Sequence, residues 1–237
     1  MRYTVKAMFQ EFWQKFELNF IADNRWQYLT NGLAVTLRVT FFAVLMGLFL
    51  GFAVAMIRNA HEHTGRFKIL NALCSLYLTV IRGTPVLVQL LLIYFAVFAS
   101  VRVDKAFTAI LAFGINSGAY QAEIFRSGIQ SLPKGQFEAG RSLGFTYFQT
   151  MTTIIMPQAI RNVIPTLCNE FIVLLKETSV ASYIALEDLT KGGDIIRSRT
   201  FDPFMPLMAV ALIYLAIVMV LTYGVKKLEQ RLAKASH

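Results

Sequence analysis

Two long apolar stretches constrain this chain more than any other feature of its sequence. Residues 39–57 contain no charged side chain, and neither do residues 203–225. A helix needs roughly 20 mostly apolar residues to cross the hydrocarbon core of a bilayer, and both stretches are long enough. The composition agrees, because 56% of all residues are hydrophobic and only 16% are charged. The sequence therefore predicts an all-α polytopic membrane protein.

Three further segments are predicted to cross the membrane. Residues 106–122 are uncharged, whereas residues 69–101 are interrupted at Arg82–Pro85, where Gly and Pro should break a helix. The last segment carries Glu170, Lys176 and Glu177, which must face protein or water. We expect about five transmembrane helices in a membrane domain spanning residues 29–232, over residues 30–58, 69–99 (broken at 82–85), 104–126, 160–184 and 203–225.

The first 28 residues form a separate N-terminal segment. They do not read as a signal peptide, because no continuous apolar core precedes Glu11 and Lys15. Aromatic residues instead recur at helical spacing among charged ones: Phe9, Phe12, Trp13, Phe16 and Phe20. This pattern suits a helix lying in the membrane interface or a helix packed on the rest of the protein.

The distribution of basic residues indicates the orientation. Five spans place the termini on opposite sides of the membrane, and Lys and Arg divide almost evenly between the two sides. A basic cluster follows the last span directly, which favours a cytoplasmic C-terminus and an N-terminus outside: Lys226, Lys227, Arg231 and Lys234. The net charge of +9 then reflects loops facing anionic lipid, and no nucleic-acid partner is expected.

A polar segment of unusual length separates the third and fourth spans. Residues 126–161 are too many for a simple turn. Pro133 suits the first turn of a helix, residues 136–151 contain no proline and are predicted to be helical, and Pro157 closes the segment. Its apolar positions include Phe137, Leu143, Phe148 and Met151. Such a helix needs a partner surface, either another protein or the membrane and the chain's own spans.

A motif in this segment resembles the signature of ABC-importer permeases. That signature reads Glu-Ala-Ala, three residues, Gly, nine residues, Ile-x-Leu-Pro. Here Glu138, Ala139 and Gly144 are followed after nine residues by Ile154 to Pro157, with Gly140 in place of Ala and Met156 in place of Leu. Residues 82–90, 119–126 and 175–180 are similar to stretches of the polar amino-acid uptake permeases. The resemblance extends from about residue 31 to about residue 231.

The resemblance implies a type I ABC importer permease fold in the bacterial cytoplasmic membrane. Residues 133–151 would contain the coupling helix that sits in a groove of a cytoplasmic ABC ATPase. The resemblance further implies two ATPase copies, a second permease copy or paralogue, an extracytoplasmic solute-binding protein and an amino-acid substrate. The implied ATPase-coupling residues are Glu138, Ala139, Gly140, Arg141, Gly144 and Pro157.

Two of these residues have alternative interpretations. Glu138 can pair with a basic residue of the ATPase or with Arg141, three residues further on. Gly144 can allow close approach or a bend in the helix, or it can mark a helix end followed by a turn.

Polar residues inside the spans are costly and often functional, so they are candidates for the solute path. The candidates are Asn116, Tyr120, Gln89 and Glu170. Asn116 and Tyr120 lie one turn apart and can line a path or hydrogen-bond to a neighbouring helix. Glu170 can meet an ammonium group or pair with Arg82 or Lys176, whereas Glu123 and Arg126 can neutralise each other.

Other function classes find less support. No Gly-Lys dipeptide occurs, so the chain has no Walker loop, and energy must come from a partner or an ion gradient. The alternative is a gradient-driven secondary carrier or channel for small polar solutes, whose inverted repeats are not evident. An enzyme would need a nucleophile or metal constellation, and we expect no catalytic residue, cofactor or metal site.

The histidines and the cysteines are not expected to form functional sites. His61, Glu62 and His63 are interpreted as a short solvated loop, with a metal site as the alternative. Cys74 and Cys168 are interpreted as small core residues without a disulfide role.

Overall fold

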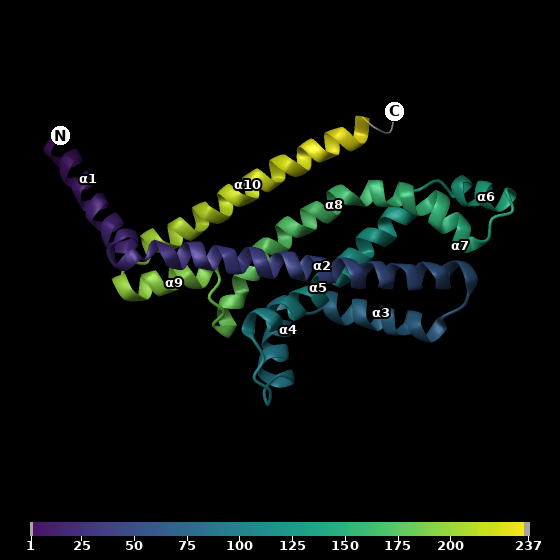
Figure 1. Ribbon diagram of the computed structural model, residues 1–237, viewed down its shortest axis with the longest axis horizontal. Coiled ribbons are helices and arrows are strands. Elements are labelled where there is room, and N and C mark those ends of the chain that lie inside the picture. Colours follow the sequence, from purple (N-terminus) through teal and green to yellow (C-terminus); the bar gives the residue numbers. More distant parts are fainter. Residues whose placement is uncertain (1, 235–237) are drawn as a thin grey trace.

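The structure is a computed structural model that describes residues 2–234. Within that range all regular structure is helical, as predicted, and the helices build an elongated molecule (Figure 1). The α-helices are α1 (Arg2–Phe16), α2 (Trp26–Thr64), α3 (Lys68–Arg82), α4 (Val86–Leu92), α5 (Lys105–Gln130), α6 (Lys134–Ser142), α7 (Tyr147–Thr150), α8 (Met156–Glu177), α9 (Leu189–Thr200) and α10 (Phe204–Lys234). Short π-helical segments (Glu17–Ile21, Ile93–Val97, Met151–Ile155) and 3-10 segments (Ala22–Asn24, Thr178–Ile184) join some of them.

Two of the described helices are long and apolar enough to cross a membrane by themselves. These are α2 and α10, and a third span results if α3 and the helix that follows it count as one bent crossing. The remaining predicted spans correspond to α5 and α8, which are more polar because residues such as Asn116 and Glu170 lie in them. Side chains of that kind must face protein or water, so we still expect five crossings.

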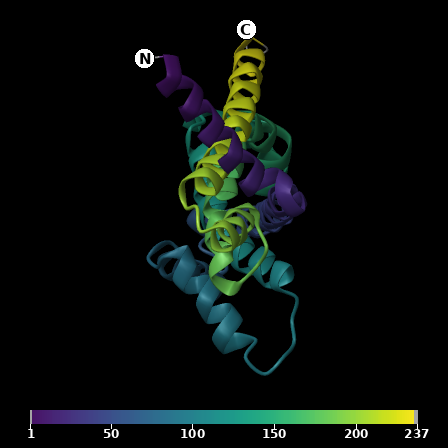
Figure 2. The same ribbon diagram turned by 90° about the vertical axis from the view of Figure 1, so that its left-hand side faces the viewer.

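The bend between α3 and α4 falls at the Gly-Thr-Pro sequence. The two helices meet at 106°, and α4 begins directly after Pro85. The amide of Gln89 holds the bend, because its Nε2 donates to the carbonyl of Ile81 and to Oγ1 of Thr84, both at 2.8 Å. Viewed end on, α3 and α4 project away from the side of the molecule on which both termini lie (Figure 2).

The long helices α2 and α5 pack closely along their length. Gly51 makes this possible, since a Cβ added there would lie 2.8 Å from the backbone nitrogen of Ala122. Small residues let helix backbones approach in this way within membranes. Larger side chains fill the space next to the contact, where Val54 and Leu78 are buried beside Ala122.

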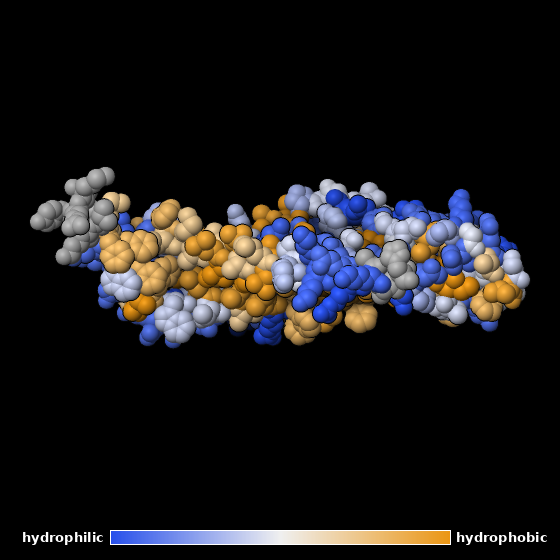
Figure 3. Space-filling model, turned by 90° about the horizontal axis from the view of Figure 1, so that it is seen from above, coloured by the Kyte–Doolittle hydropathy of each residue, from blue (hydrophilic) through white to orange (hydrophobic). Residues whose placement is uncertain are grey.

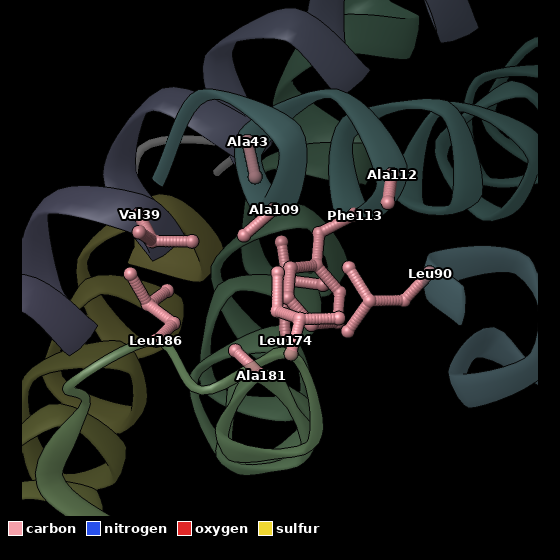
Figure 4. Close-up of a cluster of buried hydrophobic side chains, with 10 residues drawn as sticks. Val39, Ala43, Leu90, Ala109, Ala112, Phe113, Leu174, Ala181 and Leu186 are labelled. Carbon is pink, nitrogen blue, oxygen red and sulfur yellow. The ribbon is translucent and has the colours of Figure 1, made fainter. Parts of the chain in front are cut away.

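The centre of the molecule is an apolar cluster to which several helices contribute (Figure 4). The Phe113 ring of α5 is completely buried and points toward Leu90 of α4 and Leu174 of α8. Val39 and Ala43 close the cluster from α2. Fully burying one such side chain contributes about 1.5–3 kcal/mol, so the cluster fixes α4, α5 and α8 against α2.

The N-terminal segment divides into an exposed part and a packed part. Phe9, Phe12 and Trp13 of α1 are exposed, as a helix in the membrane interface would require. Phe16 and Phe20 instead pack with residues of α9 and α10 such as Ile196. Seen from above, the surface is largely hydrophobic along the first part of α10 and turns hydrophilic where α10 ends (Figure 3).

Two smaller predictions have clear outcomes. The expected loop is helical, because α2 continues through His61, Glu62 and His63 to Thr64 and is capped by Gly65. Gly65 adopts a left-handed conformation with φ 68°, and its N–H bonds to the carbonyl of His61, so the helix stops there. The prediction of a loop at this place was wrong. Both cysteines are free thiols; Cys74 is buried in the core as predicted, whereas Cys168 is only partly buried.

Candidate functional site

The signature motif lies at one end of the molecule and runs from α6 through α7 to the start of α8 (Figure 1). The prediction of a continuous helix over residues 136–151 was wrong. The first helix ends at Ser142, Gly144 takes a left-handed φ of 79°, and the second helix begins at Tyr147. The N–H of Phe145 bonds back to the carbonyl of Gly140, which closes the helix end.

The second half of the segment starts with its own cap. The Thr146 hydroxyl accepts the N–H of Gln149, and the Gln149 side chain accepts the N–H of Thr146, a reciprocal capping box. Gly144 therefore marks a helix end followed by a turn, the second of its two interpretations. We call residues 134–155, which run from α6 through α7 and the π segment, the coupling segment.

Gly140, which replaces the usual Ala of the signature, lets the two halves of the coupling segment touch. It is buried, and a Cβ there would lie 2.6 Å from Cγ2 of Thr150. Any larger residue would push α6 away from α7. The departure from the signature is thus matched by a closer packing of the segment on itself.

Several side chains of the coupling segment are exposed. Glu138, Ala139 and Arg141 face solvent on α6, as does Pro157 at the start of α8. Leu143 and Phe148 are 71% and 72% exposed. Among the described residues, Glu138 forms no ion pair, so the local pair with Arg141 is not made. Exposed apolar side chains beside unpaired charges are typical of a protein-docking surface.

A cavity of about 790 Å³ lies between the coupling segment and the ends of α2 and α5. Asn59 of α2 donates from Nδ2 to the hydroxyl oxygen of Tyr147 at 2.6 Å. The His63 ring stacks on Phe137 with 5.2 Å between ring centroids and lies 5.5 Å from the Tyr147 ring. The end of α2 therefore contacts both α6 and α7. Sequence reasoning missed Asn59 and Tyr147 and the contacts of His63 with the coupling segment, because no motif links these residues.

Burial affects the chemistry of this contact. It raises the pKa of the Tyr147 hydroxyl above its usual value, against the smaller opposing effect of the hydrogen bond from Asn59. The phenol therefore stays neutral across the physiological pH range and keeps its own proton to donate.

A second cavity, of about 670 Å³, lies between α3, α5 and α8, and we call it the polar pocket. Its lining includes Arg82, Tyr120, Glu123, Asn162, Thr166 and Glu170. The Arg82 guanidinium carbon is 5.8 Å from the centroid of the Tyr120 ring, within cation–π range. Ser117 donates its hydroxyl to Glu170 at 3.2 Å, and Glu170 forms no ion pair within the described part of the chain.

An ion-pair network surrounds Glu123 at the edge of the polar pocket. Its Oε1 lies 3.3 Å from Arg58 and 3.5 Å from Arg82, and its Oε2 lies 3.8 Å from Arg126. The local neutralisation by Arg126 is thus present but is the longest of the three contacts. Sequence reasoning could not supply Arg58 and Arg82, because they come from other helices.

The four candidate path residues divide into two pairs. Tyr120 and Glu170 line the polar pocket. Asn116 and Gln89 are buried and bond to each other, with Nδ2 of Asn116 donating to Oε1 of Gln89 at 3.0 Å. This pair ties α5 to the bend between α3 and α4. The second interpretation of Asn116, a hydrogen bond to a neighbouring helix, is the one observed.

These features define a class of protein. A helical membrane protein with a polar pocket between its spans, and an exposed two-helix segment at one end, has the form of a transport permease. The comparison with known proteins agrees. Residues 43–234 match the family described as "Binding-protein-dependent transport system inner membrane component", and the chain belongs to this family. It is a multi-pass inner-membrane protein.

Individual relatives are similar over most of their length. The chain is 36% identical to the "L-cystine transport system permease protein TcyB" of Bacillus subtilis, over 90% of each chain. It is 32% identical to the "Arginine transport system permease protein ArtQ" of the same organism, over 86% of this chain and 92% of that protein. A chain of the "Crystal structure of an amino acid ABC transporter with histidines" shares 40% identity and superimposes with a TM-score of 0.80, covering 86% and 94% of the two chains. The predicted type I ABC importer permease fold is confirmed.

Proposed function

We propose that this chain is the membrane-spanning subunit of an ATP-driven amino-acid importer. It forms the translocation pathway by alternating access and couples that pathway to ATP hydrolysis on a separate cytoplasmic subunit. The observation that carries the proposal is the coupling segment, on which the signature residues Glu138 and Arg141 are exposed and unpaired within the described chain. Two relatives of the chain are named as permeases for arginine and L-cystine, which supports a polar amino acid as the solute.

The partners follow from the same surfaces. Two copies of the ATPase would each receive one coupling segment, and an extracytoplasmic binding protein would deliver the solute. A second permease copy or a paralogue would face the polar pocket, because 43% of the Arg82 side chain and 39% of Tyr120 are exposed there. Polar groups at membrane depth need protein or water around them, and a second copy would supply the protein.

The polar pocket suits a zwitterionic solute. Arg82 offers a guanidinium for the carboxylate, and Glu170 offers a carboxylate for the ammonium group. Tyr120 lies beside Arg82 and would contact the side chain of the solute. Charge-assisted hydrogen bonds of this kind are stronger than neutral ones, so the two ends of an amino acid would be held in a fixed direction.

The orientation follows from the position of the coupling segment. A cytoplasmic ATPase requires that α6, α7 and the C-terminal end of α2 lie inside, which puts α1 and α9 outside (Figure 1). The C-terminus is then cytoplasmic, and the basic residues after residue 225 face the inner leaflet, as the positive-inside rule expects.

Uptake into proteoliposomes tests the proposal. The purified chain is reconstituted alone and together with its ATPase and binding protein, with an amino acid such as arginine as the solute. We expect concentrative uptake only with all components and ATP, and no effect of ionophores that collapse ion gradients. Concentrative uptake by the chain alone under an ion gradient would overturn the proposal in favour of a secondary carrier.

A further inference from the structure

An apolar groove of about 470 Å³ lies between α8 and α10, with α2 as its floor. Its lining includes Leu48 of α2, Leu167 and Phe171 of α8, and Leu221 and Leu228 of α10. No charged, amide or hydroxyl side chain lines it. Its volume falls within the range of roughly 300–1,000 Å³ that is usual for ligand pockets.

The groove exists because α10 is packed tightly near its start but diverges from its neighbouring helices toward its C-terminal end. Near its start α10 packs tightly on α9, where a Cβ on Gly193 would lie 2.5 Å from Cγ2 of Val210. Further along, Gly224 lines the groove, and a Cβ there would meet no atom within 4 Å. Figure 1 shows α10 diverging from α2 toward its C-terminal end. The groove is therefore open space beside Gly224, not a packed interface.

Two arginines lie where the groove ends: Arg161 near the start of α8 and Arg231 near the C-terminal end of α10. The two helices run in opposite directions (Figure 1), so Arg161 lies one turn before the lining residue Ile164, and Arg231 lies one turn after Leu228. Residues three apart share a helix face, so both arginines continue the walls of the groove. Both are exposed, and neither forms an ion pair within residues 2–234.

The groove faces away from the polar pocket. Residues Asn162, Thr166 and Glu170 of α8 line the polar pocket, whereas Leu167 and Phe171 line the groove. The exposed charges that call for a second permease copy therefore lie at the polar pocket, on the opposite side of α8 from the groove. Lipid is the remaining neighbour of an apolar surface at membrane depth.

We propose that this groove binds a phospholipid with an anionic head group, with an acyl chain beside Gly224 and the phosphate at Arg161 and Arg231. The apolar lining matches a hydrocarbon chain, and the planar guanidinium groups match the phosphate geometry. The site goes beyond the proposed transport function and does not depend on which energy source drives transport.

Native mass spectrometry of the purified full chain, with any subunits that copurify, tests the site. The probes are phosphatidylglycerol and phosphatidylcholine with identical acyl chains, added after delipidation. Basic residues near a membrane surface contribute about 1 kcal/mol each, so we expect a preference for phosphatidylglycerol on the order of tenfold. The double variant Arg161→Gln/Arg231→Gln should lose this preference. Lys226→Gln, two residues from Gly224 and thus on another face of α10, should keep it.

A second variant tests the groove itself. Gly224→Leu adds a side chain whose Cβ meets no atom within 4 Å, and it should abolish binding of both lipids by filling the groove while the chain stays monodisperse in size-exclusion chromatography. An unchanged lipid preference in the double arginine variant would overturn the proposal, as would unchanged binding with Gly224→Leu. So would a disulfide between copies formed by Gly224→Cys in membranes, because it would show a protein neighbour in the groove.

Discussion

Asn59, near the end of α2, donates a hydrogen bond to the hydroxyl oxygen of Tyr147 in α7 over 2.6 Å. Asn59 is 5% exposed, so its amide has little access to water in place of this partner. One turn further along α2, the His63 ring stacks on Phe137 of α6. A displacement of the coupling segment would therefore move α2, the long helix against which α5 packs.

Tyr147→Phe should reduce the amount of solute carried per ATP hydrolysed. The variant keeps the ring but leaves the buried amide of Asn59 without its partner, which costs roughly 1–3 kcal/mol. The measurement is the ratio of uptake to ATP hydrolysis in proteoliposomes. Tyr183→Phe is the matched control, because Tyr183 is 67% exposed. An unchanged ratio in Tyr147→Phe would mean that α2 does not take part in coupling.

Gly51→Ala should destabilise the protein. The added methyl group would lie 2.8 Å from the backbone nitrogen of Ala122 and would force α2 and α5 apart, at a cost of roughly 1–3 kcal/mol. Gly224→Ala is the control, because its methyl group meets no atom and the change removes a helical glycine. Thermal unfolding in detergent should place the melting temperature of Gly51→Ala below that of the wild type and that of Gly224→Ala at or above it. The reverse order would contradict the packing of α2 on α5.

Asp188 should make the stability of the protein depend on pH. It is the N-cap of α9, its Oδ1 accepts the N–H of Lys191 at 2.8 Å, and burial raises its pKa to about 6. Because the pKa is raised on folding, the contribution of Asp188 is fully present below the unfolded pKa of about 4 and is lost as the pH rises through 6.

The melting temperature of the wild type should therefore fall between pH 5 and pH 7 by more than that of Asp188→Asn. Asparagine also caps helices well but does not titrate, so it isolates the charge of Asp188. Differential scanning measurements of both proteins across this pH range give the difference directly. Equal pH dependence in the two proteins would exclude Asp188 as the titrating group.

Glu170→Gln should impair transport without impairing assembly. Glu170 lines the polar pocket and accepts a hydrogen bond from Ser117, and its carboxylate would contact the ammonium group of the solute. Losing a charge-assisted hydrogen bond to the solute costs about 1.5–3 kcal/mol, so the apparent affinity for the solute should fall at least roughly tenfold. Glu187→Gln, an exposed residue outside the pocket, is the control. Full uptake by Glu170→Gln would remove Glu170 from the solute path.

Local sequence patterns predicted the helical membrane architecture, because apolar stretches and helix breakers act over short distances. The break before α4 is of this kind, since Gly83 and Pro85 are adjacent to it. The division of the coupling segment was readable in principle from Gly144 followed by a Thr-x-x-Gln capping box. We expected a continuous helix because no proline interrupts residues 136–151.

The polar pocket could not be derived in the same way. Glu123 and Arg58 are 65 residues apart in the sequence, and only the packing of α2 on α5 brings them together. Likewise, nothing in the sequence near Gln89 indicates that Asn116 is its partner. Buried polar contacts between helices depend on the relative rotation of the helices, and hydropathy alone does not determine that rotation.

Copurification of an ATPase with the tagged chain tests the central claim most directly. Wild type, Glu138→Arg and the control Glu187→Arg are isolated in mild detergent, and the ATPase activity of each eluate is measured. Glu138 is exposed on the coupling segment and unpaired within the described residues, whereas Glu187 is exposed just before α9. We expect ATPase activity with the wild type and with Glu187→Arg, and its loss with Glu138→Arg. Equal activity in all three eluates, or none with the wild type, would contradict a coupling role for this segment.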